Sequence, residues 1–147
     1  MIHGHFDPAE PYRLAPRLQV LIWLPDISRQ LVAVDFLIDT GAARTSLHAV
    51  DTLGRLGISL RRLRDTAVWP GRSSVRGIGG HVDYVQTTAH YGFLHHDGRQ
   101  QTIVAPIQIA ASDHADTLPS LLGLDILQRF DLSLSWRDGR VTLTERD

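Results

Sequence analysis

The chain lacks three residue types altogether, because its 147 residues include no cysteine, no lysine and no asparagine. Without cysteine it forms no disulfide, no thiolate metal site and no thiol nucleophile. Without lysine it forms no Schiff base and no Ser-Lys catalytic pair. Glutamate occurs only at Glu10 and Glu145, near the two ends. Acid–base chemistry in this chain therefore falls to aspartate and histidine.

Strong charge and long apolar runs are also missing. The net charge is -1 with both signs mixed, so we expect no nucleic-acid partner. No apolar run approaches the ~20 residues that span a bilayer, so we expect no membrane partner. Residues 1–16 contain three prolines and no apolar signal-peptide core. We expect a cytoplasmic protein, or one domain cut from a longer chain, with an extended lead-in over 1–16 and one domain over 17–147.

The apolar fraction of 43% supports a hydrophobic core. Short β-like runs recur between turn signals, which predicts an all-β fold. One short helix is expected over 123–130, and a short helix or turn over 48–57. The expected β elements are strands over 17–25, 31–38 and 99–110, a long hairpin over 73–94 with a glycine-rich tip, and a C-terminal hairpin with a two-residue turn at Asp138-Gly139.

The segment FLIDTGAARTSL, residues 36–47, places an acid where a buried strand ends. Asp39 follows an apolar run, and Gly41 and Ala42 leave space beside it for close approach of a ligand. Thr40 adds a hydroxyl that can form hydrogen bonds. Two interpretations stand at this point. Asp-Thr-Gly is an ordinary turn, since Asp and Gly are common in turns, or Asp39 is a catalytic carboxylate.

Two later segments bear on that choice. VRGIGGHV, residues 75–82, lies in the predicted long hairpin, and SLLGLDIL, residues 120–127, places two leucines before a glycine and a helix. In this order the three motifs resemble the retropepsin-like aspartic proteases, and the cellular and bacterial members more closely than the viral ones. The resemblance covers about Leu18 to Leu143. It implies an acid-protease barrel with one short C-terminal helix, functional as a two-fold homodimer.

The resemblance also implies a site and a reaction. Asp39 would be half of a catalytic dyad, and the chain has only one Asp-Thr-Gly, so each subunit would supply one carboxylate. The ionised carboxylate would activate a water, and its protonated partner would polarise the peptide carbonyl. The enzyme would be an aspartic endopeptidase that acts on peptides or proteins without a cofactor. The other implied residues are Thr40, Gly41 and Ala42 in the active-site loop, Ile78, Gly79 and Gly80 in a flap over the substrate, and Leu121, Leu122 and Gly123 beneath the loop.

The sequence departs from the viral members near both motifs. Where they usually carry acids after the motif and an arginine after the later glycine, this chain has Ala43, Arg44 and Leu124. Arg44 could form an ion pair with Asp125, in which the positions of the acid and the base are the reverse of those in the viral members. The long segment between the motif and the flap predicts an extra element. The alternative function is a protease-fold dimer that binds peptides and cuts them slowly or not at all.

Eight histidines raise the question of a metal site. The closest pairs are His3 with His5 and His95 with His96. Neither pair has an acidic or histidine partner at a recognisable spacing, so no metal site is expected.

Overall fold

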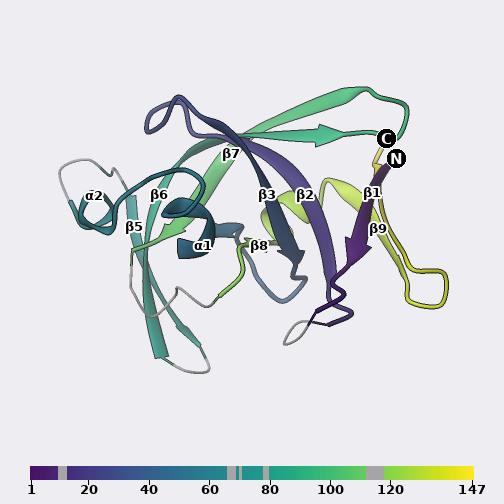
Figure 1. Ribbon diagram of the computed structural model, residues 1–147, viewed down its shortest axis with the longest axis horizontal. Helices are drawn as coiled ribbons and strands as arrows, with labels where there is room; N and C mark the ends of the chain where they lie inside the picture. The colour runs from purple at the N-terminus through teal and green to yellow at the C-terminus, as the bar shows by residue number, and fades with distance from the viewer. Residues whose placement is uncertain (10–12, 66–68, 70, 78–79, 112–117) are drawn as a thin grey trace.

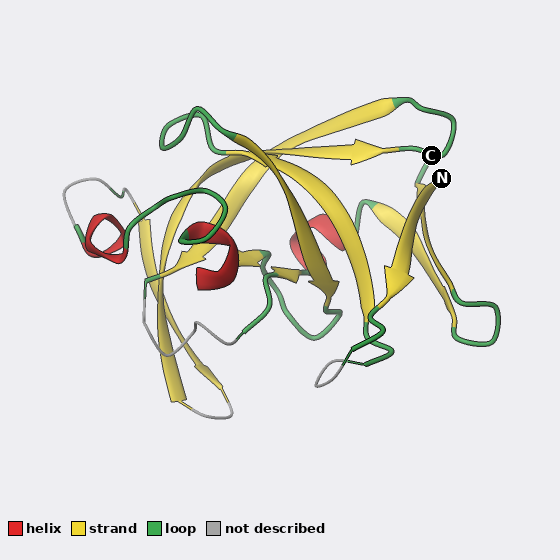
Figure 2. Ribbon diagram, viewed as in Figure 1, coloured by secondary structure: helices red, strands yellow, loops and turns green. Residues whose placement is uncertain are grey.

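The computed structural model describes residues 1–9, 13–65, 69, 71–77, 80–111 and 118–147, with the backbone alone for 73–77, 80 and 81. Figure 2 shows that these residues are mostly β-strand, which confirms the expected all-β class. The strands are β1 (Ile2–Phe6), β2 (Pro16–Trp23), β3 (Leu31–Ile38), β4 (Ser46–Leu47), β5 (Gly71–Gly77), β6 (Gly80–Leu94), β7 (Gln100–Ala110), β8 (Leu121–Leu122), β9 (Phe130–Ser135) and β10 (Arg140–Glu145). The helices are α1 (Ala49–Thr52), α2 (Leu60–Arg64) and α3 (Leu124–Leu127).

Six of the strands form a closed ring. They pair in the order β6-β7-β4-β8-β3-β2, and β2 pairs with β6 again through Ile22 opposite Tyr91. Figure 1 shows β2, β3, β6 and β7 curving around a common interior. β5 extends the ring from β6, and β1, β10 and β9 extend it from β2. The result is a small barrel that continues by one strand beyond β6 and by three strands beyond β2.

The core follows from the alternation of apolar residues along the strands. In β2, Leu18, Val20 and Ile22 are buried inside the barrel, and the residues between them are more exposed. In β3, Val34 and Phe36 are likewise buried, and the residues on either side of each are more exposed. Because successive side chains of a strand point to opposite faces, this pattern places one face of each strand in the core.

Strands β3 and β4 are consecutive in the chain, but β8 lies between them. Leu37 and Ile38 pair in parallel with Leu121 and Leu122, and Ser46 pairs with Leu121 on the other side. The connection over residues 39–45 therefore has to pass across the end of β8. This crossing brings the Asp-Thr-Gly segment and the Leu-Leu-Gly segment together, although about eighty residues separate them in the chain.

The long hairpin is present as β5 and β6, in register from Gly71 opposite Gln86 to Gly77 opposite Gly80. Its far end projects beyond the barrel (Figure 1). The residues at the tip, 78 and 79, lie outside the described part of the chain. The extra element expected before the hairpin includes α2, whose first turn is capped by the Ser59 hydroxyl accepting a hydrogen bond from the Arg62 N–H at 3.2 Å.

Three expectations differ from the structure. The lead-in over 1–16 contains β1, which pairs with β10 and β2, so it belongs to the sheet; buried Ile2 lies opposite Leu143. The C-terminal hairpin has a turn over 136–139 instead of two residues, because Ser135 pairs with Arg140. The last helix ends at Leu127 instead of Phe130, since Phe130 already begins β9, whereas α1 lies within the helix or turn expected over 48–57.

Candidate functional site

Asp39 occupies the first position after β3, at the edge of the barrel. Its N–H donates to the Leu122 carbonyl at 3.0 Å, which continues the pairing of β3 with β8 by one residue. The chain then turns, and the Ala42 N–H donates to the Asp39 carbonyl at 3.2 Å. Within this turn the Gly41 N–H donates to Asp39 Oδ1 at 2.9 Å. The segment is thus a turn, and that turn holds a half-buried carboxylate in a set direction.

The expected loop residues lie around that carboxylate. Gly41 is in close contact with it, because a Cβ added there would lie 3.2 Å from Asp39 Oδ1. Thr40 and Gly41 are exposed, and Ala42 is half-buried. The Ala42 carbonyl accepts a hydrogen bond from the Leu124 N–H at 2.8 Å. Thr40 and Gly41 of the loop therefore face solvent beside Asp39, while the Ala42 carbonyl attaches the loop to Leu124 at the start of α3.

The platform is formed by Leu121, Leu122 and Gly123, as expected. Leu122 is fully buried, and Gly123 lies directly against the backbone of the loop. A Cβ at Gly123 would lie 2.5 Å from the Arg44 carbonyl carbon and 2.9 Å from the Ala42 oxygen. Since φ of Gly123 is -97°, any residue could adopt this backbone conformation. The close approach of the two chain segments is therefore what requires glycine here.

A second link between loop and platform joins Thr45 to Asp125. The Thr45 N–H donates to both carboxylate oxygens of Asp125, at 3.0 and 3.1 Å, and the Thr45 hydroxyl donates to Oδ1 at 2.7 Å. The same hydroxyl accepts a hydrogen bond from the Gly123 N–H at 3.0 Å. Asp125 thus pairs with Thr45 and not with Arg44, so the charge pair suggested by the sequence is absent from the described residues.

A cavity of about 500 Å³ opens beside the loop. The loop contributes one wall, and β4, β6, β7 and β8 contribute the others. The described residues that line it are Gly41, Ala42, Ala43, Arg44, Ser46, Tyr84, Gln108 and Leu121. Tyr84 comes from the hairpin strand β6, so the base of that hairpin borders the same space as the loop.

Of the expected flap residues, Ile78 and Gly79 lie outside the described part of the chain. Gly80 begins β6 and pairs with Gly77. The structure therefore brings the loop and the platform into contact and shows the hairpin that would carry the flap, but it does not describe the flap tip.

Sequence reasoning missed a buried polar network beneath the loop. His48 Nε2 lies 2.9 Å from the Tyr84 hydroxyl, and its Nδ1 lies 2.6 Å from the Pro119 carbonyl. The Ser120 hydroxyl accepts from the His48 N–H at 3.0 Å and donates to Asp51. The network ties β4, α1, β6 and the segment before β8 together. The only signal for it in the sequence is a histidine and an aspartate in an otherwise apolar stretch.

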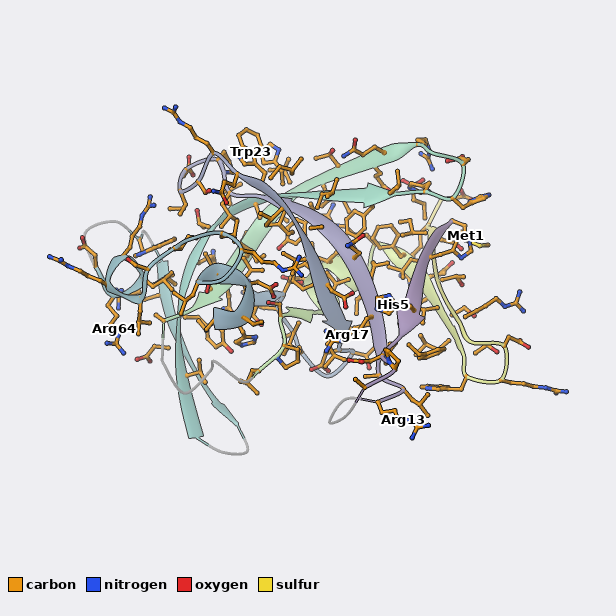
Figure 3. The ribbon with its side chains drawn as sticks, in the orientation of Figure 1. Met1, His5, Arg13, Arg17, Trp23 and Arg64 are labelled. Atoms are coloured by element: carbon orange, nitrogen blue, oxygen red, sulfur yellow. The ribbon has the colours of Figure 1, made fainter. Side chains whose placement is uncertain are left out.

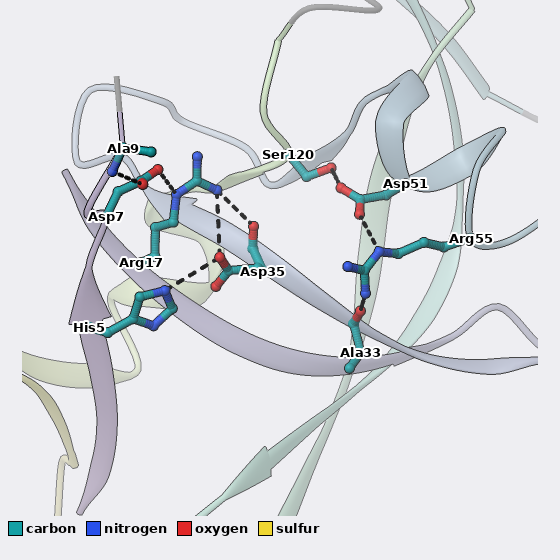
Figure 4. Close-up of polar contacts among 9 residues, drawn as sticks. All are labelled: His5, Asp7, Ala9, Arg17, Ala33, Asp35, Asp51, Arg55 and Ser120. Carbon is teal, nitrogen blue, oxygen red and sulfur yellow. Dashed lines mark hydrogen bonds and ion pairs between the residues drawn. The ribbon is translucent and has the colours of Figure 1, made fainter. Parts of the chain in front are cut away.

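Burial sets the ionisation of this network. It lowers the pKa of His48 from its ordinary value, although the Pro119 carbonyl opposes the shift. It raises the pKa of Asp51, against the hydrogen bond from Ser120 and the nearby charge of Arg55. It also raises the pKa of the Tyr84 hydroxyl. Figure 4 shows the outer part of the network, in which Arg55 lies 3.6 Å from Asp51 and donates to the Ala33 carbonyl at 2.6 Å.

A second polar cluster lies at the start of β2 (Figure 4). Arg17 donates to Asp7 at 2.8 Å and to the Asp35 carbonyl at 3.1 Å, and His5 Nε2 lies 3.4 Å from Asp35 Oδ2. The other Asp35 oxygen is buried without a hydrogen-bond partner among the described residues. This cluster fastens β1 to the barrel.

Among the residues that the structure describes, no three His, Asp or Glu side chains are grouped so that they could hold a metal ion. Within the same residues, no helix is both long and apolar enough to cross a membrane.

The chain matches no protein-family model, and a search of the curated proteins also finds no match. Its function is therefore inferred from the geometry of the site.

Proposed function

We propose that this chain is an aspartic endopeptidase with a retropepsin-like barrel, in which two copies each contribute Asp39 to one active site. The observation that carries the proposal is the position of Asp39. Its carboxylate stands at the end of a buried strand, receives the Gly41 N–H at 2.9 Å, and is supported from below by the platform of residues 121–123. A carboxylate held in this way can meet a substrate without first reorganising its own loop.

Hydrolysis of a peptide bond needs both a base and an acid. Two Asp39 side chains that meet at a two-fold axis cannot both ionise readily, so they share one proton. The ionised carboxylate takes a proton from a water, whose oxygen attacks the peptide carbonyl carbon. The protonated carboxylate hydrogen-bonds to the carbonyl oxygen and stabilises the tetrahedral intermediate. Proton transfer to the amide nitrogen then releases the two products.

The second carboxylate has to be explained, and Asp125 is the natural candidate within one chain. Its two oxygens already receive three hydrogen bonds from Thr45. Rotating that carboxylate toward a substrate would leave the buried Thr45 hydroxyl and N–H without their acceptor. This favours a partner subunit as the source of the second acid.

A surface suited to that partner lies at the same end of the barrel. Leu14 and Trp136 are 55% and 57% exposed, and the Trp136 Nε1–H donates to the Leu14 carbonyl at 3.0 Å. Leu14 precedes Arg17, which pairs with Leu37, two residues before Asp39. Figure 3 shows the Arg17 side chain near the end of β3. Exposed aromatic and aliphatic groups are typical of subunit contacts, so we propose that the partner subunit packs against Leu14 and Trp136.

The same geometry suggests how substrate would bind. An extended peptide would lie between the Asp39 loop and the β5–β6 hairpin, where strand edges offer hydrogen bonds to its backbone. The hairpin would close over it as a flap and exclude water from the reaction.

One observation favours the second candidate, a dimer that binds peptides with little or no catalysis. Ala43 and Leu124 carry no charge at the positions where viral relatives of the proposed family use an ion pair, so the loop relies on Thr45, Asp125 and backbone hydrogen bonds. A peptide-based transition-state mimic such as a statine separates the two. An active enzyme binds it far more tightly than the matching substrate peptide, whereas a simple binder does not.

The deciding experiment compares wild type, Asp39→Asn and the control Asp26→Asn on a mixed peptide library between about pH 4 and 7. Asp26 lies in the β2–β3 connection and is exposed. We expect Asp39→Asn to abolish cleavage and keep the dimer, because the amide is nearly isosteric but cannot act as a base. The control should cleave at the wild-type rate. Cleavage by Asp39→Asn near the wild-type rate would remove Asp39 from the mechanism.

A further inference from the structure

The cavity beside the Asp39 loop has a chemical character of its own. Gly41 and Ala42, which follow Asp39 by two and three residues, form part of its wall. A substrate bound at Asp39 would therefore place a neighbouring side chain at this cavity. Its volume of about 500 Å³ lies within the range of roughly 300–1,000 Å³ that is usual for ligand pockets.

Arg44 is the one charged residue among the described residues that line the cavity. Its side chain is exposed, while its backbone carbonyl is packed against Gly123. The acid nearest to it in the platform, Asp125, is occupied by Thr45. Arg44 has no ion pair with any residue that the structure describes. A guanidinium in this setting carries a full positive charge and several N–H donors.

Tyr84, the aromatic residue that lines the cavity, does not compete with Arg44 for binding an anion. His48 Nδ1 faces the Pro119 carbonyl, which only accepts hydrogen bonds, so Nδ1 carries the proton. With the proton on Nδ1, Nε2 of the neutral ring accepts a hydrogen bond from the Tyr84 hydroxyl, and burial favours this neutral form because it lowers the pKa of His48. Tyr84 thus directs its hydroxyl hydrogen away from an incoming ligand and offers its ring as a wall. Arg44 therefore supplies the one positive charge among the described residues that line this cavity.

We propose that this cavity is a specificity pocket for an acidic side chain of the substrate, aspartate or glutamate, whose carboxylate is bound by Arg44. The planar guanidinium can donate two parallel hydrogen bonds to such a carboxylate. The inference rests on the proposed function, since it assumes that a peptide lies across the Asp39 loop.

Binding and cleavage are tested separately. Fluorescently labelled peptides, each with one position changed between Glu and Gln, are titrated into Asp39→Asn, which binds without cutting, and their dissociation constants are measured by anisotropy. We expect one position at which Glu binds about tenfold more tightly than Gln, as for a hydrogen bond to a charged group. The preference should shrink at about 0.5 M salt, because the cavity is open to solvent.

Arg44 is then changed in the same background. Arg44→Gln should remove the preference for Glu, and Arg44→Glu should reverse it in favour of Lys at that position. The matched control is Arg29→Gln, an exposed arginine in the β2–β3 connection, which should leave the preference unchanged. Equal binding of Glu and Gln peptides at every position, or a preference that survives Arg44→Gln, would refute the pocket, and so would binding of no peptide at all.

The cleavage profile of the wild type on the same peptides separates this proposal from the first. Tighter binding of Glu peptides without any cleavage would contradict the proposed peptidase activity but support the specificity pocket. Cleavage with no acidic preference would contradict the pocket and keep the peptidase.

Discussion

Replacing Gly123 with alanine tests the packing on which the whole site depends. The added methyl group would lie 2.5 Å from the carbonyl carbon and 2.6 Å from the carbonyl oxygen of Arg44, and both atoms belong to backbone. A flexible side chain could rotate away from such a contact, but here the loop or the platform itself has to move. The loop is also attached to the platform by the hydrogen bond from Leu124 to Ala42 and by those from Thr45 to Asp125. Any shift therefore strains these bonds and displaces Asp39.

The expected cost is that of an overpacked core site, about 1–3 kcal/mol. For a domain of this size that corresponds to a fall of roughly 3–10 °C in melting temperature. Peptidase activity, measured at a temperature where the variant is fully folded, should fall more than stability does, since the loop that moves carries the carboxylate.

Calorimetry and a fluorogenic peptide assay measure the two effects. The matched control is Gly71→Ala, whose added methyl group meets only the Gln86 Cβ at 3.3 Å. A Gly123→Ala protein with the melting temperature and activity of wild type would show that the loop and the platform are not in close contact in solution.

Two further predictions concern the buried polar groups. Thr45→Val keeps the shape of a fully buried side chain but removes its hydroxyl, which leaves the Gly123 N–H without an acceptor. Urea denaturation should show a loss of about 1–3 kcal/mol in the free energy of unfolding. The control Thr102→Val, at an exposed position, should show almost no loss. His48 has a folded-state pKa below that of the unfolded chain, so its contribution to stability is complete above the unfolded value of about 6.5 and is lost as the pH falls below it. His48→Gln should flatten the decline in unfolding free energy between about pH 6.5 and 5 relative to wild type, and an unchanged slope would mean that His48 is not buried in its neutral form.

The sequence could predict those features of the site that depend on residues close together in the chain. Short β-like runs between turn signals located β2 and β3, and the Asp-Thr-Gly segment directly after an apolar run located the Asp39 turn. Gly77 and Gly80, from the glycine-rich segment of the long hairpin, are the last pair in its described register. These are short-range signals, because each depends on residues a few positions apart.

The remainder depends on contacts between distant segments. Thr45 and Asp125 are 80 residues apart, and His48 and Tyr84 are 36 apart. These hydrogen bonds form only because the barrel closes, and no local sequence pattern predicts which distant residues its closure brings together. The sequence instead suggested Arg44 as the partner of Asp125 from charge alone. Backbone N–H groups and a hydroxyl can satisfy a carboxylate as well as a cation does, and here they do.

The C-terminal turn shows a different limit. Asp138-Gly139 predicted a two-residue turn, yet the turn spans 136–139 with Gly139 at φ +62°. The Ser135 hydroxyl donates to Asp138 at 2.9 Å and stabilises this longer turn. Glycine marks the residue with positive φ but not the length of the loop around it.

The central claim is that two Asp39 side chains, one from each subunit, form one active site. Mixing wild type with a tenfold excess of Asp39→Asn, under conditions that allow subunits to exchange, tests it most directly. If the dyad lies between subunits, nearly all wild-type chains enter dimers with one Asp and one Asn, and specific activity should fall to about a tenth. The same excess of Asp26→Asn, which keeps its own Asp39, should cause no fall. Activity per wild-type chain that is unchanged by the Asp39→Asn excess, while sedimentation confirms mixed dimers, would contradict the dyad and assign catalysis to a single chain.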